Sequence, residues 1–193
     1  MKRIVIGVCL LLALSVTVFG SDKWSTPASS SQNIKFGIGF AAGMNTPIVQ
    51  QDQKSGSIFG FKIRAKLLPA IVLEPNLYFA KYGKPTVKDY PDYDLEGSKV
   101  TSYGIDAALG APIGGTGLKF YGVGGVGYYN TKRVQTGQDD TRFGWSAGLG
   151  FEIGFTSVIA LDLRGKAVVI PGEGGGSKKS ASVTGGLNYY FGN

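Results

Sequence analysis

Residues 143–155 read FGWSAGLGFEIGF and form the most regular segment of the chain. Every second side chain from Phe143 to Phe155 is large and apolar, apart from Ala147. The residues between them are glycine, serine and glutamate. A period of two indicates a β-strand, because successive side chains of a strand point to opposite faces. The segment therefore predicts a long strand with one apolar face and one small or polar face.

Seven further stretches alternate in the same way, and none has helical periodicity. Pro75 weakens one of them, because proline cannot donate a hydrogen bond to a ladder. In another, residues 118–129, glycines fall on both faces, which predicts a bulge that switches the register partway along. The seven stretches are residues 34–42, 59–67, 71–82, 100–111, 118–129, 159–166 and 181–191.

The connections between these stretches alternate between long and short. Bacterial outer-membrane barrels have long loops outside, short turns in the periplasm and an even number of strands. Strands of roughly ten residues also match the ~9 to 11 needed to cross a bilayer at a tilt. We therefore predict an all-β fold, an eight-stranded antiparallel up-and-down transmembrane β-barrel. The long connections are residues 44–58, 83–99, 131–141 and 171–179, and the short ones are 68–70, 112–117 and 156–157.

Alternation by itself fits two barrels of opposite polarity. A soluble ligand-binding barrel turns bulky apolar residues inward, whereas a membrane barrel turns them toward lipid. In this chain the polar face mixes glycine, alanine and serine with long charged residues. Aromatic residues also collect near the strand ends, as they do in the interfacial girdles of membrane barrels. The apolar face is therefore expected to meet lipid.

An outward apolar face leaves charges of both signs inside the barrel. Unpaired charges in so narrow a space are costly, so we expect them to form salt bridges. Long side chains can reach into the space left by glycine and alanine on other strands, which predicts a filled interior. The expected lumen charge network consists of Lys35, Lys62, Arg64, Lys66, Glu74, Asp106, Glu152, Asp162, Arg164 and Lys166.

The N-terminal segment has the pattern of a secretory signal peptide. Lys2 and Arg3 precede an apolar run over residues 4–19, which is too short for a spanning helix. We predict a signal peptide at residues 1–20, a polar leader at 21–33 and the barrel domain at 34–193. The single cysteine, Cys9, lies inside the signal peptide, so the mature chain is expected to lack cysteine.

Composition disfavours several kinds of active site. The sequence contains no histidine, which removes His-dependent triads and the commonest metal ligand. Residues 92–97 imitate the start of a calcium loop, but the final chelating position falls on Tyr103. We expect no enzymatic activity and no cofactor.

Basic residues in two long connections are candidates for contact with anionic lipopolysaccharide. Acidic residues in the same connections dilute that charge, and the net charge of +7 is spread along the whole chain. A nucleic-acid partner is therefore not expected. We expect a monomer in outer-membrane lipid. The candidate residues are Lys132, Arg133, Lys178 and Lys179.

Several segments resemble the small OmpA-like and OmpX-like outer-membrane β-barrels, which are also described as the outer membrane protein β-barrel domain or as porin-family proteins. The segments are Leu73-Glu74-Pro75 running into Leu77-Tyr78-Phe79, Tyr103-Gly104-Ile105-Asp106, residues 121–129, and Leu187-Asn188-Tyr189-Tyr190-Phe191. The resemblance implies that the barrel-assembly machinery reads the last strand through Leu187, Tyr189 and Phe191. Gly192 and Asn193 follow this aromatic end, which departs from the family pattern.

Three functions follow from these features. The first is a structural or surface-interaction barrel in the bacterial outer membrane, with a salt-bridged lumen and four extracellular loops. The alternative is a narrow porin-like channel for ions or small solutes. The third is a soluble periplasmic barrel that binds a ligand.

Overall fold

The computed structural model describes the chain in seven ranges: residues 35–48, 53–68, 70–83, 97–113, 117–132, 139–172 and 176–191. The expected signal peptide at 1–20, the leader at 21–33 and Ile34 lie outside these ranges, so they remain predictions. No helix within the described ranges is long and apolar enough to cross a membrane.

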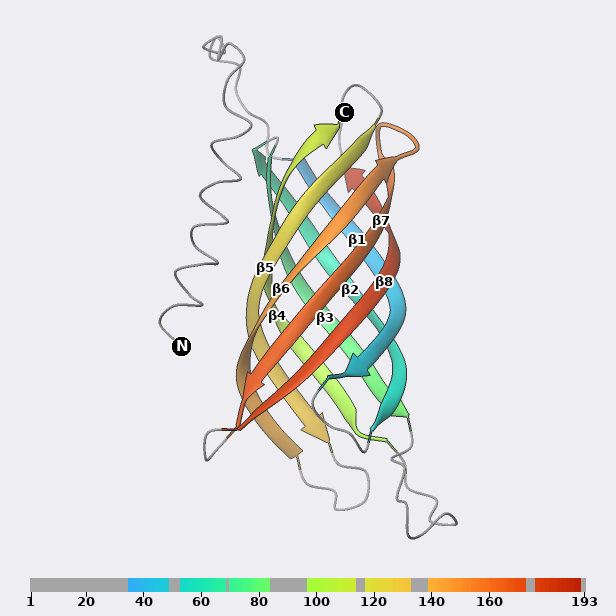
Figure 1. Ribbon diagram of the computed structural model, residues 1–193. Helices are drawn as coiled ribbons and strands as arrows, with labels where there is room; N and C mark the ends of the chain where they lie inside the picture. Colours follow the sequence, from blue (N-terminus) through green and yellow to red (C-terminus); the bar gives the residue numbers. More distant parts are fainter. Residues whose placement is uncertain are drawn as a thin grey trace. The chain divides into compact units, whose positions relative to one another are not determined.

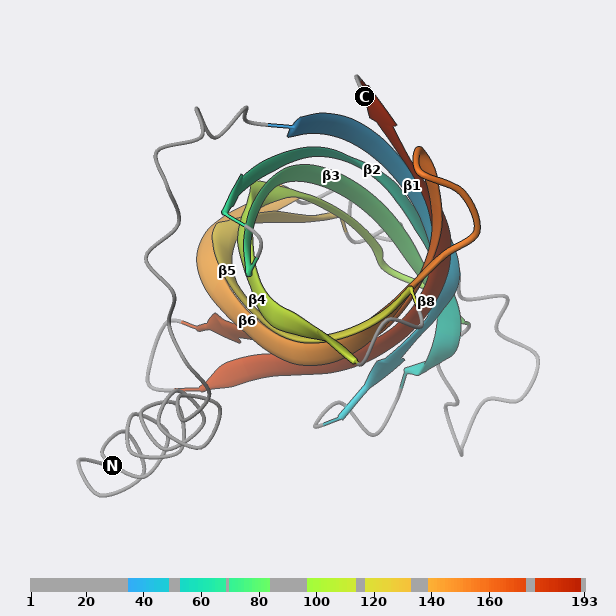
Figure 2. The same ribbon diagram turned by 90° about the horizontal axis from the view of Figure 1, so that it is seen from above.

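The described residues form a closed barrel in which each strand pairs antiparallel with its neighbours in sequence, and β8 closes onto β1 (Figure 1). Viewed along its axis, the wall is continuous around the barrel (Figure 2). This arrangement confirms the predicted fold class. The strands are β1 Lys35–Pro47, β2 Lys54–Leu68, β3 Ile71–Gly83, β4 Lys99–Ile113, β5 Leu118–Lys132, β6 Asp139–Gly154, β7 Ile159–Pro171 and β8 Ser177–Phe191.

Several strands extend further toward the loop end than their hydrophobic pattern indicates. At the end of β1, Met44 pairs with Ser57 and Asn45 with Gly56 of β2, inside the connection that the sequence predicted to be a loop. Backbone hydrogen bonds hold these pairs, and such bonds continue after the apolar alternation has stopped. The β1–β2 connection is therefore shorter than expected and runs only from residue 48 to residue 53.

The apolar face points outward, as in a membrane barrel. The side chain of Leu149 is 58% exposed and that of Val183 is 70% exposed. By contrast, Arg64 is 1% exposed and Glu74 is fully buried. A soluble barrel that binds an apolar ligand requires the opposite arrangement.

The fifth strand does not contain the predicted bulge. Its register with β4 and with β6 runs without a shift from Leu118 to Lys132, so the expected switch of faces was wrong. Tyr121, Val123 and Tyr129 all point inward. Glycine has no side chain to mark a face, so the sequence pattern there was ambiguous although the backbone is regular.

Irregular pairing occurs instead between β2 and β3. Register shifts lie between Lys54 and Ser57 and between Lys66 and Leu68. Pro75 aligns with Ile105 of β4 but has no register partner on β2. This agrees with the missing backbone donor of proline.

Small residues leave space for large inward side chains. Tyr121 of β5 is 1% exposed and aligns with Gly150 of β6. A Cβ atom added at Gly150 would lie 2.7 Å from Tyr121 Cε2, which is closer than any normal carbon contact. The ring thus occupies the volume that a side chain at position 150 would need.

Because of this packing, an added methyl group should have different effects on stability at Gly150 of β6 and at Gly124 of β5. We expect Gly150→Ala to lower the free energy of unfolding by about 1–3 kcal/mol, because the extra methyl overpacks the interior. Gly124→Ala is the matched control, since a Cβ there meets nothing within 4 Å. It should leave stability unchanged or raise it by up to about 1 kcal/mol. Guanidinium unfolding followed by tryptophan fluorescence compares the two, and equal midpoints would contradict the packing.

Candidate functional site

Charged side chains from β2, β3, β4, β6 and β7 converge in the middle of the barrel. Most are almost completely shielded from solvent, and all come from inward positions of the alternating pattern. Charges buried in this way need partners, because removing an ion from water costs several kcal/mol. The structure brings together Lys62, Arg64, Glu74, Asp106, Glu152, Asp162, Arg164 and Lys166. We call this set the interior charge cluster.

Arg164 on β7 lies between three carboxylates. Its Nη2 is 2.7 Å from Glu74 Oε2 and 3.4 Å from Asp162 Oδ2, and its Nη1 is 3.5 Å from Asp106 Oδ2. Lys166 Nζ donates to the same Asp106 oxygen at 2.9 Å. The planar guanidinium suits such a position because it presents several N–H donors at once.

Arg64 on β2 forms the second centre of the cluster. Its Nε is 2.8 Å from Glu74 Oε1, and its Nη1 donates to Glu152. The Nε and Glu74 atoms lack hydrogen-bond alignment, so their attraction is mainly that of opposite charges in close contact. Because Arg164 reaches the other oxygen of Glu74, this buried carboxylate bridges the two arginines.

Hydroxyl and amide groups complete the coordination of the carboxylates. Tyr121 donates to Asp162 and accepts from Arg164 Nε at 3.1 Å. Tyr190 Oη donates to Glu152 at 2.9 Å, and Asn188 Nδ2 donates to Glu152 at 3.0 Å.

Sequence reasoning missed this polar contribution for two different reasons. Tyr121 lies in the glycine-rich fifth strand, which the sequence pattern assigned to no single face. Tyr190 and Asn188 stood on the predicted polar face but carry no charge, so they were left out of the expected network. Tyrosine and asparagine on a lumen-facing position are the signal that would have identified them.

Lys35 and Lys66 were expected in the network but lie apart from it. They are register partners near the turn end of β1 and β2, where Lys35 is exposed and Lys66 half-buried. Within the described ranges no ion pair involves either residue. Lys119 of β5 was not among the expected residues of the network. It is also half-buried and aligns with Glu152 of β6.

Two small cavities lie on the loop side of the interior charge cluster. A cavity of about 40 Å³ lies on its loop side and includes Arg164 and Lys166 in its lining. A second cavity, of about 90 Å³, lies nearer the loops, between residues such as Tyr82 and Thr131. Each has room for only a few water molecules.

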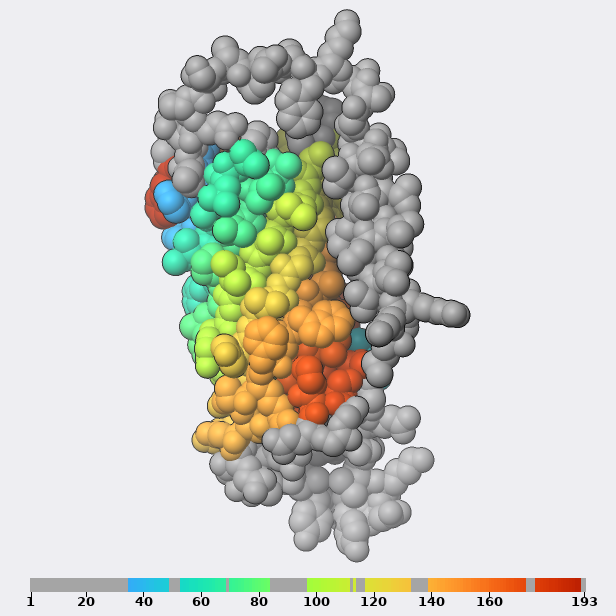
Figure 3. Space-filling model, turned by 90° about the vertical axis from the view of Figure 1, so that its left-hand side faces the viewer, coloured from blue at the N-terminus to red at the C-terminus, as the bar shows by residue number. Residues whose placement is uncertain are grey.

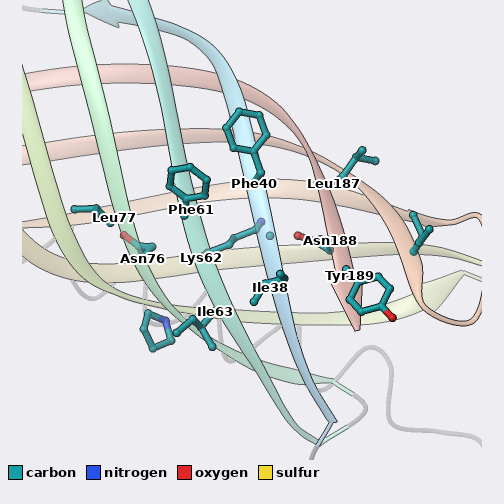
Figure 4. Close-up of a pocket in the computed structure, with 13 residues that line it drawn as sticks. Ile38, Phe40, Phe61, Lys62, Ile63, Asn76, Leu77, Leu187, Asn188 and Tyr189 are labelled. Carbon is teal, nitrogen blue, oxygen red and sulfur yellow. The ribbon is translucent and has the colours of Figure 1, made fainter. Parts of the chain in front are cut away.

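A larger hollow of about 740 Å³ is lined by residues of β1, β2, β3 and β8 and by Ile159 at the start of β7 (Figure 4). Its lining is almost entirely apolar, and Phe40, Phe61 and Leu187 belong to the outward face. Lys62 and Asn188 also border it, from the inward side of their strands (Figure 4). The hollow is thus part of the surface that we expect to meet lipid.

The described residues contain no group of histidine, cysteine, aspartate or glutamate side chains that could hold a metal ion. Three carboxylates of the interior charge cluster, Glu74, Asp106 and Asp162, each contact at least one arginine or lysine and are nearly solvent-free. The arrangement is suited to filling the lumen.

The basic residues expected in the loops do not form one patch. Lys132 is exposed at the end of β5, whereas Lys178 and Lys179 lie on β8. Lys178 Nζ is 3.6 Å from Asp140 Oδ2, and Lys179 is exposed. Arg133 lies outside the described ranges.

The proposed assembly signal forms an outward row on β8. Leu187, Tyr189 and Phe191 are all about half exposed, and the rings of Tyr189 and Phe191 lie 5.3 Å apart. Phe191 aligns with Phe36 at the seam between β8 and β1. Gly192 and Asn193 fall outside the described ranges.

The fold is similar to several solved outer-membrane barrels. Neisserial surface protein A has a TM-score of 0.68 and 14% identity, with 81% of this chain and 97% of that chain covered. A major outer membrane protein from Thermus thermophilus has a TM-score of 0.53 and 12% identity, covering 83% and 100%. The N-terminal barrel of Pseudomonas aeruginosa OprF has a TM-score of 0.52 and 16% identity, covering 80% and 97%.

These identities are low, so the likeness concerns the fold alone. No curated protein matches the sequence. The family model described as outer membrane protein beta-barrel domain matches residues 6–191, nearly the whole chain. With its closed antiparallel barrel and outward apolar face, the chain belongs to the outer membrane protein beta-barrel domain family.

Proposed function

We propose that the protein is a non-conducting barrel of the bacterial outer membrane that acts as a rigid anchor for four extracellular loops. The observation that carries this proposal is the interior charge cluster, in which Arg64, Glu74 and Arg164 meet across the lumen. Export through the predicted signal peptide and the absence of enzymatic activity are part of the same proposal. The loops lie at connections 48–53, 84–98, 133–138 and 172–176.

The closed interior supports a mechanical role. An ion moving through the barrel would have to displace Arg164 from its carboxylates. This would leave the buried guanidinium without its acids and would take one cation from each of three buried carboxylates. The two small cavities on the loop side have Tyr82 and Arg164 in their linings and are far narrower than a water-filled channel. We therefore favour the structural or surface-interaction role over the narrow channel.

The soluble periplasmic barrel receives no support from the arrangement of the faces. Its ligand would need an apolar interior, whereas Phe61 and Leu149 point outward and Arg64 points inward. In water, the many exposed apolar side chains of the outward face would promote aggregation.

Planar-bilayer recording tests the closed lumen directly. We expect the wild-type protein to give no unitary current steps, because the interior charge cluster blocks the path. The double variant Arg64→Ala/Tyr121→Ala removes two fully buried side chains and should open a measurable conductance. Phe61→Ala, on the outward face, is the matched control and should stay silent. Reproducible steps from the wild-type protein would favour the channel instead.

The energetic importance of the cluster is testable by unfolding. Arg164→Met is expected to lower the free energy of unfolding by about 3–5 kcal/mol, because it takes one cation from each of three buried carboxylates. Lys179→Met removes an exposed lysine of β8 and should change stability by no more than about 0.5 kcal/mol. Guanidinium titration in lipid vesicles gives both values. Equal stability of the two variants would show that the cluster does not hold the barrel together.

A further inference from the structure

Three lysines stand side by side at the loop end of the barrel. Lys81 of β3 aligns with Lys99 of β4, and Lys99 aligns with Lys132 of β5. All three are exposed and occupy outward positions of their strands. Neighbouring strands lie about 4.8 Å apart, so the three side chains arise within about 10 Å of one another. We call them the lysine row.

From the lysine row toward the middle of the barrel, the outward side chains change from charged to polar and then to aromatic. Two residues along β4 and β5 the outward face carries Thr101 and Asn130, and Asn130 aligns with Thr141 of β6. On β3 the corresponding residue is Phe79. Two residues further it carries the rings of Tyr103, Tyr128 and Phe143. Adjacent rings in this set are 5.7 Å and 5.8 Å apart. Figure 3 shows this side of the barrel, where β3 to β6 follow one another.

This order matches the depth profile of a membrane interface. Tyrosine rings prefer the boundary between hydrocarbon and headgroups. The lysine row lies four residues beyond the rings, which is about 13 Å along the strands and about 10 Å along the normal for strands tilted by about 40°. The lysines are therefore at the level of charged headgroups, and the hydroxyl and amide groups lie between.

The charge of the lysine row is not compensated within the described ranges. None of its three members forms an ion pair there. Asp139 aligns with Lys132 at one end of the row, whereas Asp140 already contacts Arg142 and Lys178. Like charges directly opposite one another on neighbouring strands repel. An external anion would relieve this repulsion.

We propose that the lysine row binds the phosphate groups of a phosphorylated glycolipid in the outer leaflet. Three adjacent cations next to one carboxylate suit a headgroup with more than one phosphate. The polar step at Thr101, Asn130 and Thr141 suits the sugar to which such phosphates are attached. The site deepens the surface role proposed above. It depends on insertion into the membrane, but it does not depend on a closed lumen.

Native mass spectrometry of the detergent-solubilised protein tests this site with lipid A that carries two phosphates. The variant Lys81→Gln/Lys99→Gln/Lys132→Gln should bind it at least about tenfold more weakly than the wild-type protein, since each lysine near an anionic surface contributes to affinity. The single variant Lys99→Gln should show a smaller loss in the same direction. The matched control Lys35→Gln/Lys66→Gln/Lys119→Gln removes equal charge at the turn end of the barrel and should bind within about twofold of wild type.

Three results would overturn the site. One is equal loss of affinity in the control, which would mean that only net charge matters. A second is that lipid A without its phosphates binds the wild-type protein as tightly as lipid A with two phosphates. A third is that inorganic phosphate binds the wild-type protein and loses affinity to the same extent in the triple lysine variant. A heat-modifiable band on unboiled gels shows that each variant is folded. Current steps in bilayers would contradict the closed lumen while leaving this site intact.

Discussion

The bridge from Arg64 through Glu74 to Arg164 is the contact on which the barrel interior depends. It connects the neighbouring strands β2 and β3 to β7, which pairs with neither of them. The bridge therefore ties opposite sides of the barrel together. A carboxylate as buried as Glu74 is tolerated only beside cations, and each guanidinium in turn needs its acids. Tyr121 and Tyr190 then occupy remaining donor and acceptor positions.

The same alternation of side chains provides both surfaces of the wall. Outward residues such as Phe61 and Leu149 match hydrocarbon, while inward residues form the charge cluster. No separate core of apolar side chains is needed, because lipid takes the place of that core outside. This inverted polarity explains why glycine is so frequent on the inward face, where Gly150 leaves room for Tyr121.

The closed lumen that we propose would leave the loop end and the outer wall as the interaction surfaces of the protein. The connections there join strands of which several contribute side chains to the interior charge cluster. The lysine row, made of Lys81, Lys99 and Lys132, stands near the loop end of those strands, where we propose that it binds lipid phosphates. A barrel of this design can fix its depth and orientation in the membrane while its loops meet other molecules.

From the sequence alone, the alternation in residues 143–155 and its counterparts determined the strand order, the closed barrel and all eight members of the interior charge cluster. Side-chain direction in a strand is a local property, so it can be read directly from spacing. Only the tertiary structure decided that β5 is regular, that Lys35 and Lys66 stand apart, and that Lys81, Lys99 and Lys132 meet. The distance between side chains on different strands depends on hydrogen-bond register and on closure of the sheet. Neither can be predicted from the sequence of one strand, because both depend on how the strands pair.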